Sequence, residues 1–166
     1  MRILKKIERA VGRWLIKHSN FRPRQSTRTA LFFYKRWGMN LIGPPNFIAS
    51  SSWFDGADFS KITLTEGCTI SRETRFLTHD WSKYNVGLAI GDSEVCARSV
   101  IRPIYIGNYS FIGAGSLIMP GTTIGKGCVI GAGSVVRGNI SDFSLVIGNP
   151  AKKIADTRDY YRKTDK

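Results

Sequence analysis

The sequence is poor in cysteine and histidine. Its 166 residues contain three cysteines and two histidines. Cys68, Cys96 and Cys128 lie far apart and include no CxxC pair, which argues against a disulfide framework or a structural zinc site and favours a reducing, cytoplasmic environment. A zinc site of the carbonic anhydrase type needs three His ligands for each metal ion. We therefore expect no bound metal.

Long apolar runs are also missing. No stretch approaches the roughly 20 consecutive apolar residues that a membrane-spanning helix requires. Near the N-terminus, charged residues such as Lys5, Lys6 and Arg9 interrupt each apolar run before it reaches the length of a signal-peptide core. The sequence predicts neither a transmembrane helix nor a signal peptide.

Acidic residues are scarce at the front of the chain. Residues 1–40 hold 11 Lys and Arg against a single acid, Glu8, and so supply most of the formal net charge of +13. Residues 41–150 hold eight basic and eight acidic residues, and residues 151–166 hold six and three. The basic excess favours a polyanionic partner, either nucleic acid, an anionic membrane or a phosphorylated ligand.

The neutral middle of the chain contains a repeat of six residues. Aliphatic side chains recur without a break at Val100, Ile106, Ile112, Ile118, Ile124, Ile130 and Val136. Mostly small residues stand four places later, at Ile104, Ser110, Ser116, Thr122, Cys128, Ser134 and Ile140. An α-helix with 3.6 residues per turn cannot keep such a set on one face. A three-sided coil can, because each hexad then supplies one short strand and one corner, and three hexads complete a turn.

A weaker copy of this register precedes it. Leu64, Ile70 and Phe76 are six residues apart, with Cys68 and Thr74 at the small position. Cys68 and Cys128 are therefore expected to be small buried residues and not reactive thiols. Glycine follows the aliphatic residue at Gly107, Gly113, Gly125 and Gly131, where we expect corners with positive φ.

The segments outside the repeat predict helices and one long loop. Residues 2–17 carry Ile3, Leu4, Ile7, Val11, Trp14 and Leu15 at helical spacing among basic residues, which is typical of a basic amphipathic helix. Residues 27–38 predict a second helix that ends at Gly38, and residues 152–166 a short polar helix. Residues 77–99 break the register and are expected to loop out on one face.

These signals divide the chain into three parts: a helical arm (1–40), a coil (41–150) with an inserted loop (77–99), and a tail (151–166). Basic amphipathic helices can lie on the anionic inner face of a cell membrane. The arm can equally pack on the coil and leave its basic face in solvent. The sequence is compatible with both interpretations.

The run IGNYSFIGAGSLIMPGTTIGKGCVIGAGSVV, followed by IGNPAKKI, resembles the hexapeptide-repeat acyltransferases, and most closely the sugar O-acetyltransferases that modify galactosides, maltose, nodulation factors and surface polysaccharides. The resemblance spans about residues 40–155. It implies an all-β solenoid, a left-handed parallel β-helix that forms a homotrimer with active sites between subunits. It also implies transfer of an acetyl group from acetyl-CoA to a sugar hydroxyl, in the biosynthesis of a surface polysaccharide or related glycan.

The resemblance points to His79 as the catalytic base. His79 lies in FLTHDW, where the early register breaks into the loop. A sugar hydroxyl attacks a thioester only as its proton is removed, and a neutral imidazole is suited to remove it near neutral pH. A backbone N–H on the adjoining coil would stabilise the developing oxyanion. Asp80 is expected to orient the ring, bind the acceptor or cap the turn. The alternative is that His79 is only a polar loop residue; His18 is expected to be solvated.

The inserted loop offers groups suited to a glycan acceptor. Aromatic faces stack on sugar rings, while carboxylates and amides bind hydroxyls, so we expect Trp81, Tyr84, Asn85 and Asp92 to bind the acceptor. Lys83 and Arg98 lie in the same loop. Packing between subunits of a trimer is an equally good explanation for any one of these side chains.

The resemblance also assigns an acetyl-CoA groove. It matches Phe111 to a residue beside the pantetheine arm, and Ala114 and Ala132 to small corner residues that let the ligand approach the backbone. Arg137 and Lys152 match polar and basic contacts to the cofactor, whose phosphates favour positive charge. The sequence departs from several relatives at Ala155, where they have Arg, so Lys153 is expected to contribute as well. Coil geometry and a solvated surface are the alternative explanations.

Two other functions remain open. The protein could acetylate the nitrogen of an amino sugar, or a hydroxyl of a xenobiotic such as an antibiotic, since those enzymes share the coil and the loop histidine. It could instead be a non-catalytic structural or nucleic-acid-binding protein that uses its basic arm. The arm contains no recognisable DNA-reading motif, so we expect no nucleic-acid partner.

Overall fold

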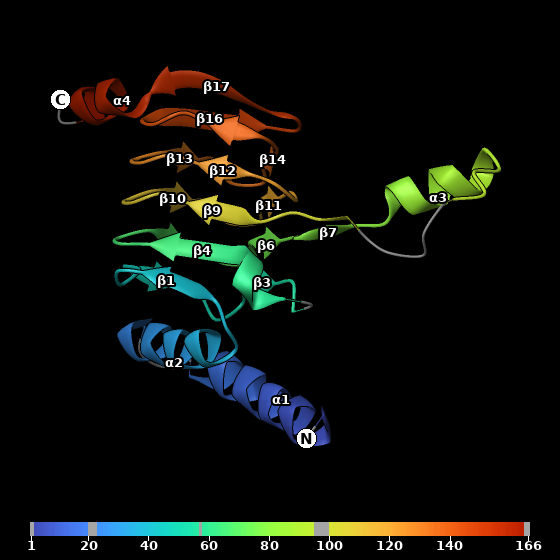
Figure 1. The fold of residues 1–166 in the computed structure, drawn as a ribbon. Helices are drawn as coiled ribbons and strands as arrows, with labels where there is room; N and C mark the ends of the chain where they lie inside the picture. Colours follow the sequence, from blue (N-terminus) through green and yellow to red (C-terminus); the bar gives the residue numbers. More distant parts are fainter. Residues whose placement is uncertain (1, 20–22, 57, 95–99, 165–166) are drawn as a thin grey trace.

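The hexad repeat forms a coil of short parallel strands with three faces (Figure 1). The computed structural model describes residues 2–19, 23–56, 58–94 and 100–164, so that Cys96 and Arg98 lie outside the described residues. The first turn of the coil consists of β1 (Asn40–Ile42), β2 (Phe47–Ile48) and β3 (Trp53–Phe54). The second consists of the short 3-10 helix η1 (Phe59–Lys61), β4 (Ile62–Thr65), β5 (Thr69–Ile70) and β6 (Arg75–Phe76). The later turns consist of β9 (Ile104–Ile106), β10 (Phe111–Ile112), β11 (Leu117–Ile118), β12 (Thr123–Ile124), β13 (Val129–Ile130), β14 (Val135–Val136), β15 (Asn139–Ile140) and β16 (Ser144–Gly148).

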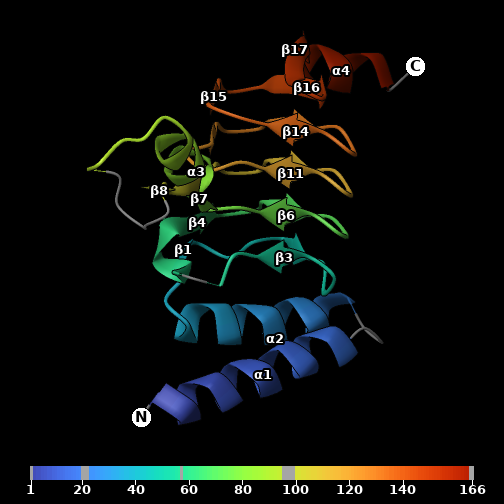
Figure 2. The same cartoon turned by 90° about the vertical axis from the view of Figure 1, so that its right-hand side faces the viewer.

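Each face is a stack of strands taken from successive turns. The faces have the orders β1-β4-β9-β12-β15, β2-β5-β10-β13-β16 and β3-β6-β11-β14, and every neighbouring pair among them is parallel. The coil rises from β1 to β16 with a left-handed turn (Figures 1 and 2). This hand is the reverse of the usual crossover between parallel strands. The predicted left-handed parallel β-helix is confirmed.

The core is a column of aliphatic side chains with small residues at the corners. From Ile106 to Val136 every aliphatic residue of the hexads is buried, as are the small residues from Ser110 to Ser134. The small residues are polar for a reason: Ser110 Oγ donates to the Gly125 carbonyl at 2.7 Å. A hydroxyl at this position therefore satisfies a backbone group that the corner leaves unpaired. The buried Cys68 and Cys128 occupy the same position, as predicted.

The six-residue register differs from the predicted one in two ways. It includes the first turn of the coil, and its unbroken part begins later than Val100. Ile48 and Phe54, in the first turn, are buried in the same column, and the Phe54 ring stacks on Phe76 with centroids 4.6 Å apart. Val100, in contrast, does not point into the coil. It pairs with Asp80 in an antiparallel ladder outside the three faces, so the unbroken repeat begins at Ile106.

The expected role of the glycines that follow the aliphatic residues was wrong. Positive φ occurs later in each corner, for example at Gly115 and Gly133. Gly113 is required for another reason, because a Cβ there would lie 2.6 Å from the backbone nitrogen of Ala132 in the next turn. These glycines permit close stacking of turns and do not supply left-handed backbone.

Two helices cover the first turn of the coil. They are α1 (Arg2–His18) and α2 (Pro23–Arg36), which begins four residues earlier than predicted and is followed by Gly38 with φ of 99°. Figure 2 shows α2 against the first turn and α1 below it. Ala30 and Tyr34 of α2 are buried in the core cluster, and burial raises the pKa of the Tyr34 phenol well above its ordinary value. No described helix is long and apolar enough to span a bilayer.

The predicted loop is a projecting segment with its own secondary structure. It contains β7 (His79–Asp80), α3 (Ser82–Ala89) and β8 (Val100–Ile101), and β7 pairs with β8 in an antiparallel ladder. Figure 1 shows α3 standing away from the body of the coil.

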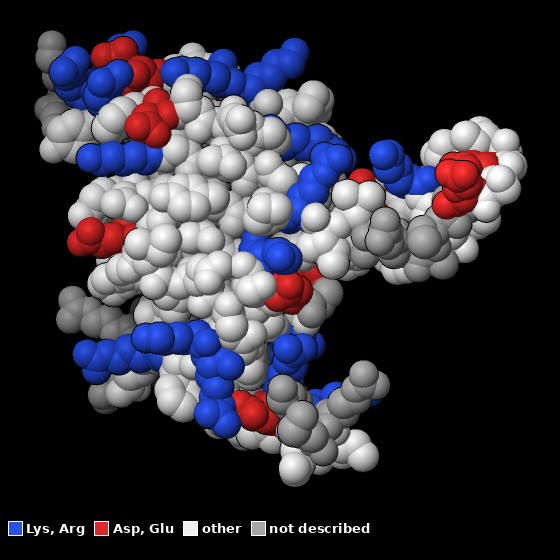
Figure 3. All heavy atoms as spheres, viewed as in Figure 1, with Lys and Arg blue, Asp and Glu red and all other residues white. Residues whose placement is uncertain are grey.

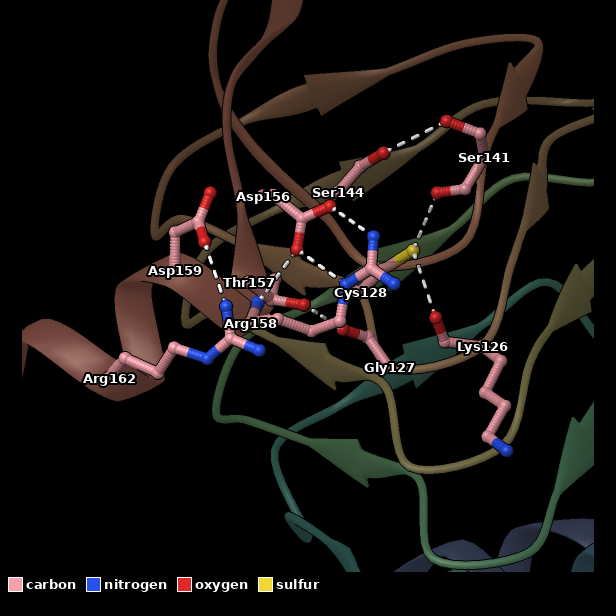
Figure 4. Close-up of polar contacts among 10 residues, drawn as sticks. All are labelled: Lys126, Gly127, Cys128, Ser141, Ser144, Asp156, Thr157, Arg158, Asp159 and Arg162. Carbon is pink, nitrogen blue, oxygen red and sulfur yellow. Dashed lines mark hydrogen bonds and ion pairs between the residues drawn. The ribbon is translucent and has the colours of Figure 1, made fainter.

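The last part of the chain is a strand followed by a helix, where the sequence predicted a helix alone. β17 (Ala151–Asp156) pairs antiparallel with β16, and α4 (Thr157–Thr164) follows. Figure 4 shows how this segment is held: Thr157 Oγ1 donates to the Gly127 carbonyl at 2.7 Å, and Arg158 pairs with Asp156. The Arg158 guanidinium holds the pKa of the Asp156 carboxyl well below its usual range. The antiparallel strand closes the last turn of the coil, whose backbone groups would otherwise form an open sheet edge.

Candidate active site

His79 lies at the edge of the coil where the projecting segment with β7, α3 and β8 begins. It follows β6 and begins β7, and its side chain is about one-third exposed. Its Nδ1 contacts the carboxylate of Asp55, which comes from the end of β3 in the turn below. A buried carboxylate and a partly exposed imidazole therefore meet at one corner of the prism.

The Asp55 carboxylate is held in place by several contacts. Its side chain is buried, and its Oδ2 accepts hydrogen bonds from the Thr78 backbone N–H at 3.2 Å and from Thr78 Oγ1 at 2.9 Å. Its own backbone N–H donates to the Phe76 carbonyl at 3.0 Å. Because a carboxylate only accepts hydrogen bonds, Nδ1 of His79 carries a proton, and in the neutral ring Nε2 then keeps its lone pair. The arrangement thus holds His79 in the tautomer that can accept a proton from a substrate.

Asp55 is a candidate site residue that the sequence did not predict. It follows the core residue Phe54 just as Leu77 follows Phe76, so it occupies the equivalent corner one turn earlier. The six-residue register indicates this contact when it is extended back to the first turn, because Asp55 follows a core position of that turn. An acid adjacent to a core position, one turn before a histidine at the same corner, is the pattern to look for.

Asp80 takes one of the three roles expected for it. Its Oδ1 accepts from the Ser82 backbone N–H at 2.8 Å and so caps the turn into α3. This hydrogen bond lowers the pKa of the Asp80 carboxyl, with smaller contributions from the charges of Arg137 and Arg102. The carboxylate that contacts the ring is Asp55 and not Asp80; a direct part of Asp80 in catalysis stays a prediction.

Arg137 lies on the same edge of the coil as the histidine. Hydrogen bonds between turns link the corner residues in order, from Leu77 N–H to the Ile118 carbonyl at 2.9 Å and from Met119 N–H to the Val136 carbonyl at 3.0 Å. Arg137 is the next residue of this column, two turns above Leu77, and its side chain is exposed. Arg137 therefore places a positive charge near His79 and near the projecting segment.

The other predicted cofactor residues lie elsewhere on the chain. Ala114 and Ala132 are exposed and stack at the opposite edge of the β3-β6-β11-β14 face, where Gly133 N–H donates to the Ala114 carbonyl at 2.8 Å. Phe111 is half-exposed on the neighbouring face. Lys152 is exposed on β17, opposite Ile147. Within one chain these residues do not form a single cluster with His79.

A groove crosses the face between those two edges. It has a volume of about 590 Å³ and is lined by Ser51, Trp53, Glu73, Arg75, Leu77 and Leu117. Leu77 is two residues from His79, and Trp53 is nearly half exposed. The groove combines an aromatic face with one charge of each sign, groups that suit a polar ligand bearing an apolar segment.

The residues predicted to bind the acceptor lie at different distances from His79 along the projecting segment. Trp81 lies beside the site and forms an edge-on contact with Tyr84, with ring centroids 5.9 Å apart. Asn85 is exposed on α3. Asp92 follows the outer end of that helix, on the order of 12 Å from its start. Trp81 is therefore placed near His79 of its own chain, and Asp92 is not.

Comparison with known proteins identifies the repeat in part of the coil. Residues 103–138 match the family model described as bacterial transferase hexapeptide (six repeats). This segment contains β9 to β14. No curated protein sequence matches the chain significantly.

Three solved structures with a similar fold are acetyltransferases. A galactoside acetyltransferase in complex with coenzyme A is 20% identical, with a TM-score of 0.65 over 95% of this chain and 84% of the other. A hexapeptide-repeat acetyltransferase of Vibrio cholerae, complexed with acetyl coenzyme A, is 20% identical, with a TM-score of 0.60 over 90% and 85%. A maltose O-acetyltransferase from Clostridium difficile is 21% identical, with a TM-score of 0.55 over 92% and 88%. At these identities the likeness shows that the fold is shared.

Proposed function

We propose that the protein transfers an acetyl group from acetyl-CoA to a sugar hydroxyl, with His79 as the general base. The observation that carries this proposal is the pair of His79 and Asp55 at the edge of a hexapeptide coil. A buried carboxylate that orients a partly exposed imidazole is an arrangement suited to activating a hydroxyl nucleophile. We infer acetyl-CoA as the acyl donor and a sugar as the acceptor from the similar solved structures, a galactoside acetyltransferase in complex with coenzyme A and a maltose O-acetyltransferase.

The reaction follows from the tautomer that Asp55 imposes. Nε2 of His79 accepts the proton of the sugar hydroxyl as its oxygen attacks the thioester carbonyl of acetyl-CoA. A C–O bond forms and the C–S bond breaks, and the imidazolium returns the proton to the leaving thiolate. The products are an acetyl ester and coenzyme A, and the Asp55 carboxylate stabilises the imidazolium while it exists.

Other parts of the proposed site come from the exposed residues around the coil. Phe111, Ala114, Ala132, Arg137 and Lys152 are proposed to contact acetyl-CoA, and Trp81, Tyr84, Asn85 and Asp92 the acceptor. His79 and the Ala114–Ala132 corner lie at opposite edges of one face. That separation supports a homotrimer in which neighbouring chains each supply part of a site. The cytoplasmic pool of acetyl-CoA favours a role in the cytoplasm, in glycan biosynthesis.

The test is an acetyl-transfer assay with a matched pair of histidine variants. Purified protein, acetyl-CoA and a panel of sugars and glycans are mixed, and thiol release is followed. His79→Ala is expected to lower kcat by about 10²–10⁴, the usual contribution of a general base. His18→Ala, which removes an exposed histidine on α1, is expected to leave the rate unchanged. Near-normal rates for His79→Ala would show that the proposed mechanism is wrong. The panel includes amino sugars and xenobiotics, so it also separates O-acetylation from N-acetylation.

A further inference from the structure

Helix α1 turns its apolar face to the solvent. Six large apolar side chains form a stripe along the helix and are exposed: Ile3, Leu4, Ile7, Val11, Trp14 and Leu15. At 100° per residue they occupy one continuous arc of the helix surface. Ile3 is 73% exposed and Trp14 59% exposed, fractions more typical of charged side chains than of apolar ones.

The side of α1 that contacts the rest of the protein carries few large apolar side chains. Glu8 pairs with Arg36 of α2, and Arg9 Nη1 donates to the Gly56 carbonyl at 3.1 Å. The Arg9 guanidinium also lies over the Phe59 ring, 5.6 Å from its centroid. Ile16 is the large apolar residue of α1 that is buried. The helix is thus inverted relative to an ordinary amphipathic helix, which buries its apolar face on the core.

Basic residues border the exposed stripe. Lys6, Arg13 and Lys17 are exposed and lie next to it on the helix surface. Figure 3 shows further Lys and Arg side chains gathered over α2, where Arg28, Lys35 and Arg36 are exposed. Residues 41–150 of the coil are electrically balanced, so most of the net positive charge belongs to residues 1–40, at the same end as the stripe.

We propose that α1 lies in the surface of an anionic lipid bilayer, with its apolar stripe inserted among the acyl chains and its basic border on the headgroups. The charge selects this occupant over a second copy of the chain. Two copies packed stripe to stripe would bring two arms of strongly positive charge together, which is unfavourable. An anionic surface neutralises that charge, and the apolar stripe with Trp14 suits the boundary between headgroups and acyl chains.

The position of α1 in the fold permits this contact. The helix is the outermost layer and runs across one end of the coil (Figure 2), whereas β17 and α4 lie at the other end (Figure 1). The His79 corner belongs to the side of the coil. A membrane beneath α1 therefore leaves the site accessible, and the proposal does not depend on acetyl transfer.

Vesicle sedimentation of the full-length protein tests this inference. We expect binding to vesicles of phosphatidylcholine mixed with phosphatidylglycerol, weak binding to phosphatidylcholine alone, and release as sodium chloride is raised. The double variant Ile7→Glu/Trp14→Glu is expected to lower partitioning more than about tenfold, since each buried apolar side chain contributes about that factor. Ile154→Glu, at the opposite end of the coil and of similar exposure to Ile7, is the matched control and is expected to bind like the original protein.

Three results would overturn the proposal. The first is failure of the original protein to bind the mixed vesicles. The second is equal binding by the double variant, with its fold verified by circular dichroism. The third is a fall in oligomeric mass caused by the double variant in sedimentation velocity without lipid, which would identify the stripe as an interface between copies.

Discussion

Replacing Asp55 by asparagine tests how His79 is prepared for proton transfer. One carboxylate oxygen, Oδ2, contacts the Thr78 backbone N–H, Thr78 Oγ1 and Nδ1 of His79, so a single atom of the asparagine must replace it. The amide oxygen can take that position and accept all three hydrogen bonds, but it carries no negative charge. The imidazolium that forms when Nε2 accepts a proton then loses the charge that stabilises it. Proton transfer from the substrate to His79 therefore becomes less favourable.

The expected loss is that of a general base. We predict that Asp55→Asn lowers kcat by about 10²–10⁴, equivalent to roughly 2.7–5.4 kcal/mol of activation free energy. KM for acetyl-CoA should change little, because Asp55 is buried and contacts the ring and Thr78. The free energy of unfolding should fall by only about 1 kcal/mol, since the bonds to Thr78 can be kept.

The assay compares steady-state thiol release by the original protein, Asp55→Asn, His79→Ala and the double variant. Because Asp55 acts through His79, the double variant should be no slower than His79→Ala. Asp58→Asn is the control: Asp58 caps η1 three residues further on, and its carboxylate bonds Ser60. The reasoning is refuted if Asp55→Asn stays within about threefold of the original rate, or if the two losses multiply in the double variant.

The coil was predictable where the corners are regular. Between Ile106 and Val136 each turn repeats the same aliphatic and small residues, so local pattern alone determines which side chains point inward. The first turn was not predicted because its corners contain Pro44, Pro45 and a run of serines in place of the repeated glycines. The pairing of Asp55 with His79 was missed for the same reason, since it joins adjacent turns and depends on that register.

The orientation of α1 could not be predicted at all. Its sequence predicts an apolar face and a basic face, and this pattern is identical whether the apolar face points inward or outward. Contacts distant in sequence decide the matter, namely Arg9 with Gly56 and Glu8 with Arg36. For the last segment, the prediction of a helix over residues 152–166 was wrong at Ala151–Asp156 for a different reason. AKKIAD alternates too little to indicate a strand, and it becomes one because the exposed backbone groups of β16 pair with it.

Three further predictions test other parts of the molecule. Lys152→Ala should raise KM for acetyl-CoA about tenfold with little change in kcat, whereas Lys126→Ala, also exposed, should not; equal effects would refute a phosphate contact. Burial raises the pKa of the Cys68 thiol to about 12, so Cys68 should resist alkylation at pH 8 until denaturant is added, as mass spectrometry can check. Because this folded-state pKa lies above the ordinary value near ~8.5, the associated stability is present below that pH and is lost as pH rises toward about 12. Gly12→Ala should destabilise the protein in thermal unfolding. The added Cβ would lie 2.5 Å from the Trp37 ring, and such overpacking typically costs about 1–3 kcal/mol. The gain in helix propensity is at most about 1 kcal/mol. A higher melting temperature would mean that α1 is not packed against α2 at this position.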